Sequence, residues 1–192
     1  MKHQNQPVGF TRLTAIHAPL PADRAPDEGV AGMQYTEIRS PVGSLLLAID
    51  EAGLRHIRFV DGRRKERPEP SWTKDPVPFT ALIRELRAYF RGELKRFDQP
   101  LAPEGTAFQR QVWSELCGIP YGETISYQEL ATRVGNPQAS RAVGLANGAN
   151  PIPIIIPCHR VIGSDGKLTG YGGGLAIKQK LLALERGQLR LL

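Results

Sequence analysis

The chain has 192 residues, of which 41% are hydrophobic and 23% charged, so it can bury an ordinary core and lacks the composition of a disordered protein. Its 25 Lys and Arg against 19 Asp and Glu give a formal charge of +6, which permits a polyanionic partner without requiring one. The longest apolar runs, Leu45 to Ile49 and Ile152 to Ile156, are much shorter than the roughly 20 residues that cross a bilayer. No apolar secretory segment follows residues 1–7, so we expect a cytoplasmic protein without a membrane anchor.

Cysteine usage narrows the chemistry. The only two cysteines, Cys117 and Cys158, lie far apart and form no Cys-x-x-Cys pair. This pattern excludes a disulfide scaffold and a clustered structural zinc site. We therefore expect neither a metal nor a cofactor, and any functional cysteine should act as a thiol.

The first half of the chain predicts an extension followed by a small sheet. Residues 1–32 carry four prolines and no periodicity, which indicates a poorly ordered extension. Three short strands are then expected at Tyr35–Arg39, Ser44–Ile49 and Leu54–Val60, joined by turn residues as an antiparallel meander. The charged, proline-bearing segment Asp61–Asp75 is interpreted as a solvated loop.

A helix and a linker complete the predicted N-terminal α/β domain, residues 33–102. Apolar residues recur at helical spacing up to Gly92, at Phe79, Leu82, Leu86, Tyr89 and Phe90. The segment Pro100–Pro103 resembles a linker, so residues 103–192 are predicted to form a second domain.

Helix-start signals dominate that second domain. Thr106 with Gln109, and Ser126 with Glu129, have the spacing of capping boxes. Gly135 ends the helix that Ser126 begins, and Asn136-Pro137 is expected to start the next one, running to Gly148. Two helices so closely joined indicate a helix-turn-helix, with an ordinary αα-hairpin as an equal alternative. A last helix is expected from about Leu175 to Arg186.

The segment from Asn150 to Ile162 carries the candidate chemistry. The apolar, β-branched run Ile152 to Ile156 is expected to be buried. Three prolines prevent a regular helix or central strand there, so the sequence predicts a rigid loop ahead of Cys158. A cysteine in such a place is often only a small buried hydrophobe. A neighbouring base or cation favours the thiolate, and His159 and Arg160 follow directly, so we expect a nucleophile with a pKa below the free value of about 8.5.

A histidine base needs an orienting group. Glu185 follows Leu181 and Leu182 at helical spacing and thus lies on the apolar stripe of the last helix. A carboxylate near a helix C-terminus is also disfavoured by the helix dipole, which makes a dedicated role more plausible.

The residues Pro157-Cys158-His159-Arg160-Val161-Ile162 resemble the active-site motif of the O6-alkylguanine-DNA alkyltransferases, or methylated-DNA–protein-cysteine methyltransferases. The resemblance covers about residues 34–187 and is strongest after Thr106. It includes Phe108–Trp113, Ile119–Tyr127, Asn136-Pro137, Arg141–Gly144, Asn150-Pro151, Gly170–Leu175 and Leu184-Glu185.

This resemblance implies an α+β fold. A small N-terminal antiparallel-sheet domain of ribonuclease H-like type would precede a mostly helical, winged helix-turn-helix domain. The implied protein repairs DNA as a monomer. It binds duplex DNA through the minor groove, flips out O6-alkylguanine or O4-alkylthymine, and transfers the alkyl group irreversibly to its own cysteine in a single turnover.

The resemblance also assigns roles. Cys158 would attack the alkyl carbon, His159 would take the thiol proton through a bridging water, Glu185 would hold His159, and Asn150 would tie the cysteine loop to the helix-turn-helix. Residues implied against DNA or the base are Ser126, Tyr127, Asn136, Gln138, Arg141, Val161, Tyr171 and Gly172.

Among these, Tyr127 would assist rotation of the nucleotide and donate toward the base. Arg141 would fill the space that the base vacates, and the carbonyls of Cys158 and Val161 would accept from the guanine amine. Gly172 stands where the family can have Ser, which leaves only its backbone N–H for that contact.

Small residues in the segment 137–148 suit a helix that presses into a minor groove about 6 Å wide. The segment from Glu104 to Asn150, however, contains three Arg and four Glu, so its net charge is −1. Positive charge for DNA would thus come from Arg160, Lys167, Lys178, Lys180 and the N-terminal half, and we expect modest affinity with a shallow salt dependence.

Two other hypotheses remain on the residues alone. A Cys-His-Glu hydrolase would use Cys158 for acyl transfer and regenerate its thiol at each turnover. A helix-turn-helix regulator would carry an inert cysteine, although the small residues of segment 137–148 argue against base reading.

Overall fold

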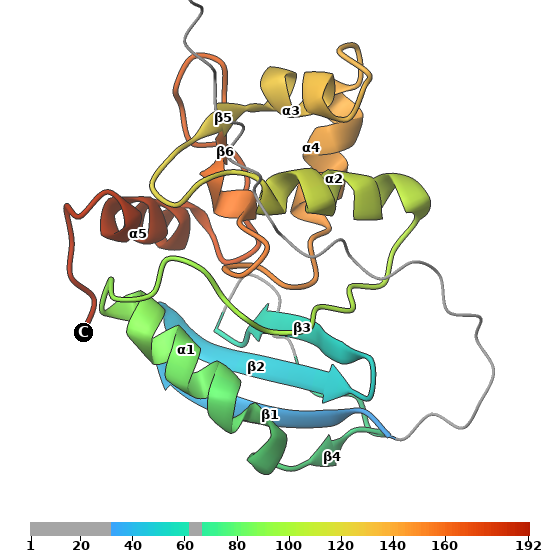
Figure 1. Cartoon of the computed structure of the whole chain (residues 1–192), viewed down its shortest axis with the longest axis vertical. Coiled ribbons are helices and arrows are strands. Elements are labelled where there is room, and N and C mark those ends of the chain that lie inside the picture. Colours follow the sequence, from blue (N-terminus) through green and yellow to red (C-terminus); the bar gives the residue numbers. More distant parts are fainter. Residues whose placement is uncertain (1–31, 62–66) are drawn as a thin grey trace, which may run out of the picture.

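The computed structural model describes residues 32–61 and 67–192 (Figure 1). The predicted disordered extension lies outside these residues, apart from Gly32. Strands β1 (Gln34–Ser40), β2 (Gly43–Asp50) and β3 (Gly53–Phe59) form the predicted antiparallel meander. The side chains of β2 from Leu45 to Ala48 are fully buried, because both faces of this central strand are covered.

The fourth strand of this sheet was not predicted, nor were the two-residue strands of the C-terminal half. The two-residue β4 (Thr73–Lys74) pairs in parallel with Gln34 and Tyr35, and the sheet order is β3-β2-β1-β4. The interpretation of segment 61–75 as loop throughout was therefore wrong at its end. A two-residue strand has no measurable periodicity, and its partner is distant in the sequence, so no local pattern indicates it.

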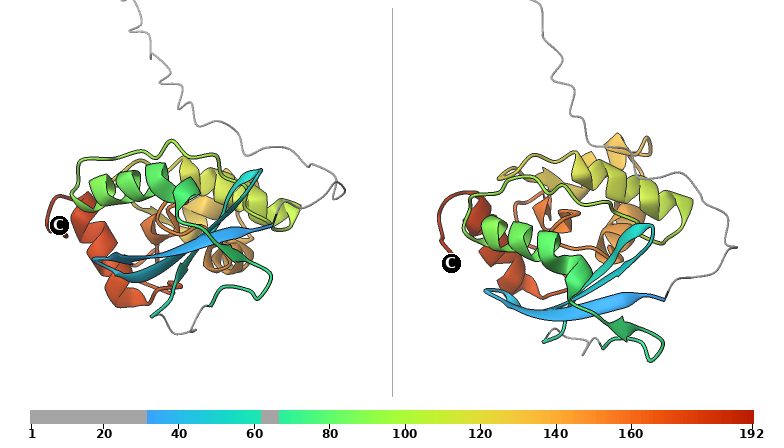
Figure 2. Two further views of the ribbon diagram at one scale, coloured as in Figure 1. Left: turned by 90° about the horizontal axis from the view of Figure 1, so that it is seen from below. Right: turned by 60° about the horizontal axis from the view of Figure 1, so that its bottom comes forward.

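Helix α1 (Thr80–Phe90) follows a short 3₁₀ turn, η1 (Val77–Phe79), and lies along the sheet in the views of Figures 1 and 2. All five residues of the predicted apolar stripe are buried. The helix ends at Phe90, and Gly92 follows two residues later with a φ of +75°, which is unfavourable for residues with a side chain.

The C-terminal half is mostly helical, as expected, and comprises α2 (Ala107–Cys117), β5 (Ile125–Ser126), α3 (Tyr127–Arg133), α4 (Ser140–Gly148), η2 (Cys158–Arg160), β6 (Val161–Ile162) and α5 (Leu175–Glu185). Thr106 and Gln109 form the predicted reciprocal capping box of α2. Trp113 on α2 donates its Nε1–H to the carbonyl of Ala146, 2.9 Å away, which fixes α2 against α4.

The predicted start of the second helix in the helix-turn-helix was wrong. Helix α4 begins at Ser140, and residues 136–139 form a turn instead. Asn136 Oδ1 accepts from the backbone N–H of Gln138, and the Asn136 carbonyl accepts from Ala139. The asparagine therefore stabilises a turn with its side chain, a known alternative to capping a helix.

The two halves share one buried core and meet along the edge strand β3. Leu54 exchanges backbone hydrogen bonds with Pro100 and Ala102, and Ile57 N–H donates to the Pro151 carbonyl over 2.9 Å. These bonds satisfy an otherwise unpaired sheet edge. The division at residues 102 and 103 stays a prediction. Within the described ranges, none of the helices is long and apolar enough to cross a membrane.

Candidate active site

The loop ahead of Cys158 is closed by one side chain. Asn150 donates from Nδ2 to the Ile156 carbonyl at 2.7 Å and accepts at Oδ1 from the Ile152 N–H at 3.0 Å. Within this loop Ile154 has a φ of +78°, and no other non-glycine residue among those described has a positive φ. The chain then turns into η2, which carries Cys158 and His159 in a fixed position.

Cys158 is only 5% exposed, and burial raises the pKa of its thiol to about 11. The hydrogen bond of Asn150 and the charge of Lys178 oppose this shift without cancelling it. Our expectation of a pKa below 8.5 is therefore wrong for the protein alone, because desolvation outweighs the nearby polar groups. A cysteine with this pKa is a thiol at neutral pH and would have to lose its proton to act as a nucleophile.

Glu185 is the centre of a buried hydrogen-bond network. Its Oε1 accepts from His159 Nε2 at 2.7 Å, Tyr89 Oη at 2.7 Å and Arg160 Nη2 at 3.0 Å. Its Oε2 accepts from Arg160 Nε at 2.8 Å and the Gly122 N–H at 3.1 Å. Burial alone would raise the pKa of this carboxyl, but the hydrogen bonds from His159 and Arg160 and the charge of Arg160 hold it well below its usual range. Glu185 is thus ionised.

His159 is fully buried, and desolvation lowers its pKa despite the adjacent carboxylate. The neutral ring donates Nε2–H to Glu185, which leaves Nδ1 as a proton acceptor. Nδ1 is buried and has no hydrogen-bond partner within the described part of the chain. The ring is therefore oriented by Glu185 and retains one basic nitrogen for a proton.

Two of the expected DNA-binding cations are buried. Arg160 is 7% exposed and is engaged by Glu185 and by the Ile119 carbonyl, 2.6 Å from its Nη1. Lys178 donates from Nζ to the carbonyls of Val161 at 2.6 Å and Thr169 at 2.8 Å, and burial lowers its pKa to about 8. Neither can contact phosphate, so the prediction that Arg160 and Lys178 supply positive charge for DNA was wrong. The other two predicted lysines, Lys167 and Lys180, are exposed.

The two carbonyls expected to accept from guanine already have partners. Val161 O accepts from Lys178, while Cys158 O accepts from the Val161 N–H and, at 3.5 Å, from Asn147 Nδ2. A carbonyl has two lone pairs, so Val161 keeps one acceptor site for a ligand.

The helix-turn-helix presents the expected DNA-facing residues. Ser126 caps α3 by accepting from the Glu129 N–H, and Tyr127 is its first residue. A Cβ placed on Gly144 of α4 would lie 3.7 Å from the Tyr127 ring, so the ring rests against that helix. The remaining predicted contacts are exposed, at Asn136, Gln138 and Arg141.

A short parallel ladder joins this surface to the cysteine. Ile125 pairs with Val161, and Ser126 pairs with Ile162. The start of α3 therefore lies beside the segment that follows Cys158. The ladder thus places residues expected to contact DNA close to the expected nucleophile.

Tyr171 lies beside His159, and Gly172 follows it in the chain. The Tyr171 ring contacts Phe59 at 5.7 Å and His159 at 6.4 Å between centroids, both edge to face. Its hydroxyl is buried without a partner in the described structure, and burial raises its pKa well above the usual value. Gly172 is exposed, and a Cβ there would meet no atom within 4 Å.

Comparison with known proteins agrees with this geometry. The family model described as "6-O-methylguanine DNA methyltransferase, ribonuclease-like domain" matches residues 33–103, and that described as "6-O-methylguanine DNA methyltransferase, DNA binding domain" matches residues 107–187. The chain belongs to the 6-O-methylguanine DNA methyltransferase family.

Individual relatives support this membership. A methylated-DNA–protein-cysteine methyltransferase of Methanosarcina barkeri is 56% identical over 158 residues, which are 82% of this chain and 100% of the relative. One from Mycolicibacterium paratuberculosis is 54% identical over 154 residues, covering 80% and 93%. A crystal structure of Mycobacterium tuberculosis OGT in complex with DNA matches with a TM-score of 0.76 at 51% identity, covering 81% and 94%. The predicted family, enzyme class and α+β fold are thereby confirmed.

Sequence reasoning did not predict the buried hydrogen bonds that Lys178 and Tyr89 make in the methyltransferase. Lys178 shares a helix face with Leu181, Leu182 and Glu185, so the spacing argument used for Glu185 could have found it. The sequence placed Tyr89 on an apolar helical stripe, as an ordinary core residue. Only the tertiary structure brings its hydroxyl to Glu185.

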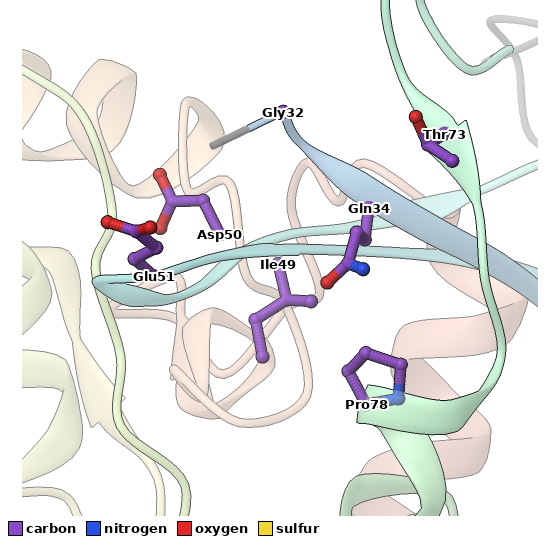
Figure 3. A pocket seen from close by; sticks show the side chains of 7 residues that line it. All are labelled: Gly32, Gln34, Ile49, Asp50, Glu51, Thr73 and Pro78. Carbon is purple, nitrogen blue, oxygen red and sulfur yellow. The ribbon is translucent and has the colours of Figure 1, made fainter. Parts of the chain in front are cut away.

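The methyltransferase also has a hollow of about 360 Å³ in its N-terminal half (Figure 3). Figure 3 shows the carboxylates of Asp50 and Glu51 at one side of it, and Asp50 is paired with Arg55 at 2.7 Å. None of the predicted site residues lines this hollow. It is separate from the candidate active site.

Proposed function

We propose that this DNA repair methyltransferase uses Cys158 as the residue that accepts the alkyl group from O6-alkylguanine or O4-alkylthymine. The observation that best supports this role is the buried His159–Glu185 pair directly beside Cys158. Within the described residues, His159 Nδ1 has no hydrogen-bond partner and is available to accept a proton. The relatives are named methylated-DNA–protein-cysteine methyltransferases, which identifies a protein cysteine as the methyl acceptor in them. Of the two cysteines, Cys117 lies at the end of α2, where burial raises the pKa of its thiol to about 12 despite the charge of Arg160.

The proposed chemistry is a single displacement. The thiol proton passes through a bridging water to His159 Nδ1, and the ionised Glu185 stabilises the resulting imidazolium. Cys158 Sγ forms a bond to the alkyl carbon while the bond from that carbon to guanine O6 breaks. The electron pair returns to the guanine ring, toward which the Tyr127 hydroxyl donates. A thioether remains on Cys158, and no group of the network can remove it, so each molecule acts once.

We place duplex DNA against the helix-turn-helix, with α4 in the minor groove. The exposed Arg141 stands near the start of α4 with the exposed Leu145 one turn beyond it. The small residues Ala142 and Gly148 are exposed beside them, which allows close approach of the helix to the groove. Extruding the base costs a few kcal/mol, and a planar guanidinium can stack in the gap that it leaves. We further propose that a cytoplasmic monomer is the active form.

Intact mass spectrometry after incubation with O6-methylguanine duplex tests the proposal. We expect a mass increase of one methyl group, located by peptide mapping on Cys158 and retained after excess substrate. Cys117→Ser should behave like the unchanged protein, whereas Cys158→Ser should gain nothing. More than one lesion repaired per molecule, or regeneration of the thiol as in a hydrolase, would refute it.

A further inference from the structure

One hydrogen bond connects the N-terminal half directly to the proposed proton relay. Tyr89 lies on α1, is 0% exposed, and donates from its hydroxyl to Glu185 Oε1 at 2.7 Å, across 96 positions of sequence. The other residues of the relay, Cys158, His159 and Glu185, all belong to the C-terminal half. Helix α1 thus contributes a polar group as well as an apolar face.

Glu185 does not need Tyr89 to stay in place. Arg160 donates hydrogen bonds to both carboxylate oxygens of Glu185, and the Gly122 N–H donates to Oε2. Two oxygens of a carboxylate offer about four acceptor sites, and here they receive five donors. Tyr89 shares Oε1 with His159, so each of these two donors weakens the hold of the oxygen on the other.

We propose that Tyr89 is a positioning residue that sets the proton affinity of His159 through their shared oxygen. The Tyr89 hydroxyl takes up part of the negative charge on Oε1 and so limits how strongly Glu185 stabilises an imidazolium. His159 is then kept neutral at rest and able to receive the thiol proton. This inference rests on the proposed function of the His159–Glu185 pair.

Other ionisable groups face the same pair and must be held constant. Arg160 and Lys178 oppose protonation of His159, and Cys158 lies beside it. The phenols of Tyr121 and Tyr171 also face Glu185. Since all of these remain in a Tyr89 variant, a change in titration reports the lost hydroxyl.

The test is Tyr89→Phe, which keeps the ring packed against Phe90, Phe97 and Tyr121 and removes only the donor. Single-turnover methyl transfer to Cys158 is followed from about pH 5 to pH 9, around the ordinary titration of histidine. We expect the acid limb of the rate profile to move to higher pH by about 0.5–1 unit, because a competing hydrogen bond is lost. An NMR titration of the His159 ring should move in the same direction.

Tyr121→Phe is the matched control, because it removes a neighbouring hydroxyl for which the structure shows no hydrogen bond to Glu185. Its acid limb should not move. Site-specific 3-fluorotyrosine at position 89 provides a second probe that preserves the fold. Its more acidic hydroxyl is a stronger donor and should move the acid limb to lower pH.

The outcomes separate this inference from the proposed function. If the unchanged protein transfers methyl groups but Tyr89→Phe loses only thermal stability, with the rate profile and the NMR titration unmoved, Tyr89 is purely structural. A shift to lower pH would also overturn the inference. If the unchanged protein transfers no methyl group, the proposed function fails, while the NMR titration still decides whether Tyr89 controls His159.

Discussion

Replacing Glu185 by Gln should destabilise the protein as well as slow its chemistry. An amide has one oxygen and one NH₂ group, whereas the carboxylate accepts five hydrogen bonds. If the amide oxygen takes the place of Oε1, its NH₂ group meets Arg160 Nε and the Gly122 N–H, which are also donors. Arg160, with 9% of its side chain exposed, then lacks its counter-ion.

Removing one partner of a buried ion pair typically costs about 3–5 kcal/mol of unfolding free energy. For a chain of this size, each kcal/mol lowers the melting temperature by about 2–4 °C, so we expect a loss of about 6–20 °C. Urea unfolding at neutral pH measures the free energy directly. Single-turnover transfer, measured well below both melting temperatures, should be slower because the imidazolium loses its counter-charge, while DNA affinity stays nearly unchanged.

The pH dependence of this difference has a defined sign. The pKa of Glu185 is lowered in the folded protein, so its stabilisation is fully present above the unfolded value of about 4.3. It is lost progressively as pH falls below that value toward the folded pKa. The two proteins should therefore differ most at neutral pH and converge in acid. A neutral-pH difference below about 1 kcal/mol would refute the account of Glu185 as the counter-ion of Arg160.

Three further predictions concern the nucleophile and the DNA-facing helix. Thiolate absorbance should show Cys158 titrating near pH 11 in the protein alone, with Cys158→Ser as the blank; titration at or below the free value of about 8.5 would contradict its desolvation. Arg141→Ala should strongly slow repair in duplex DNA and barely change the rate of reaction with free O6-benzylguanine. Arg141→Lys should behave nearly like Arg141→Ala; if Lys restores activity, Arg141 is a phosphate contact. Leu145 is 73% exposed and lies one turn beyond Arg141 on α4. Leu145→Glu should weaken duplex binding about tenfold or more and leave the reaction with free base intact. Unchanged duplex binding would show that α4 does not contact DNA.

The sequence predicted the elements whose signals are local. Short runs separated by turn residues indicated β1 to β3, and the capping box at Thr106 indicated the start of α2. The apolar stripe of α5 even indicated that Glu185 is buried. Local signals failed where a side chain has two uses, as at Asn136, which stabilises a turn and does not cap α4.

The rest of the site depends on contacts between distant residues. Tyr89 reaches Glu185 only because the C-terminal end of α1 meets the C-terminal end of α5, and no spacing in the sequence encodes that approach. The pKa of Cys158 was predicted with the wrong sign for a related reason. His159 and Arg160 are visible next to it in the sequence, but the desolvation that dominates arises from the whole surrounding core.

The left-handed backbone of Ile154 restricts how this loop can be re-engineered. Such a conformation costs about 1–3 kcal/mol for a residue with a side chain, so glycine would relieve the backbone. The Ile154 side chain is only 1% exposed, however, and truncating a buried isoleucine as far as alanine already costs about 2–5 kcal/mol. The packing loss exceeds the conformational gain. Glycine, the usual remedy for a positive φ, should therefore make this protein less stable, and only changes that retain the buried volume can be accommodated.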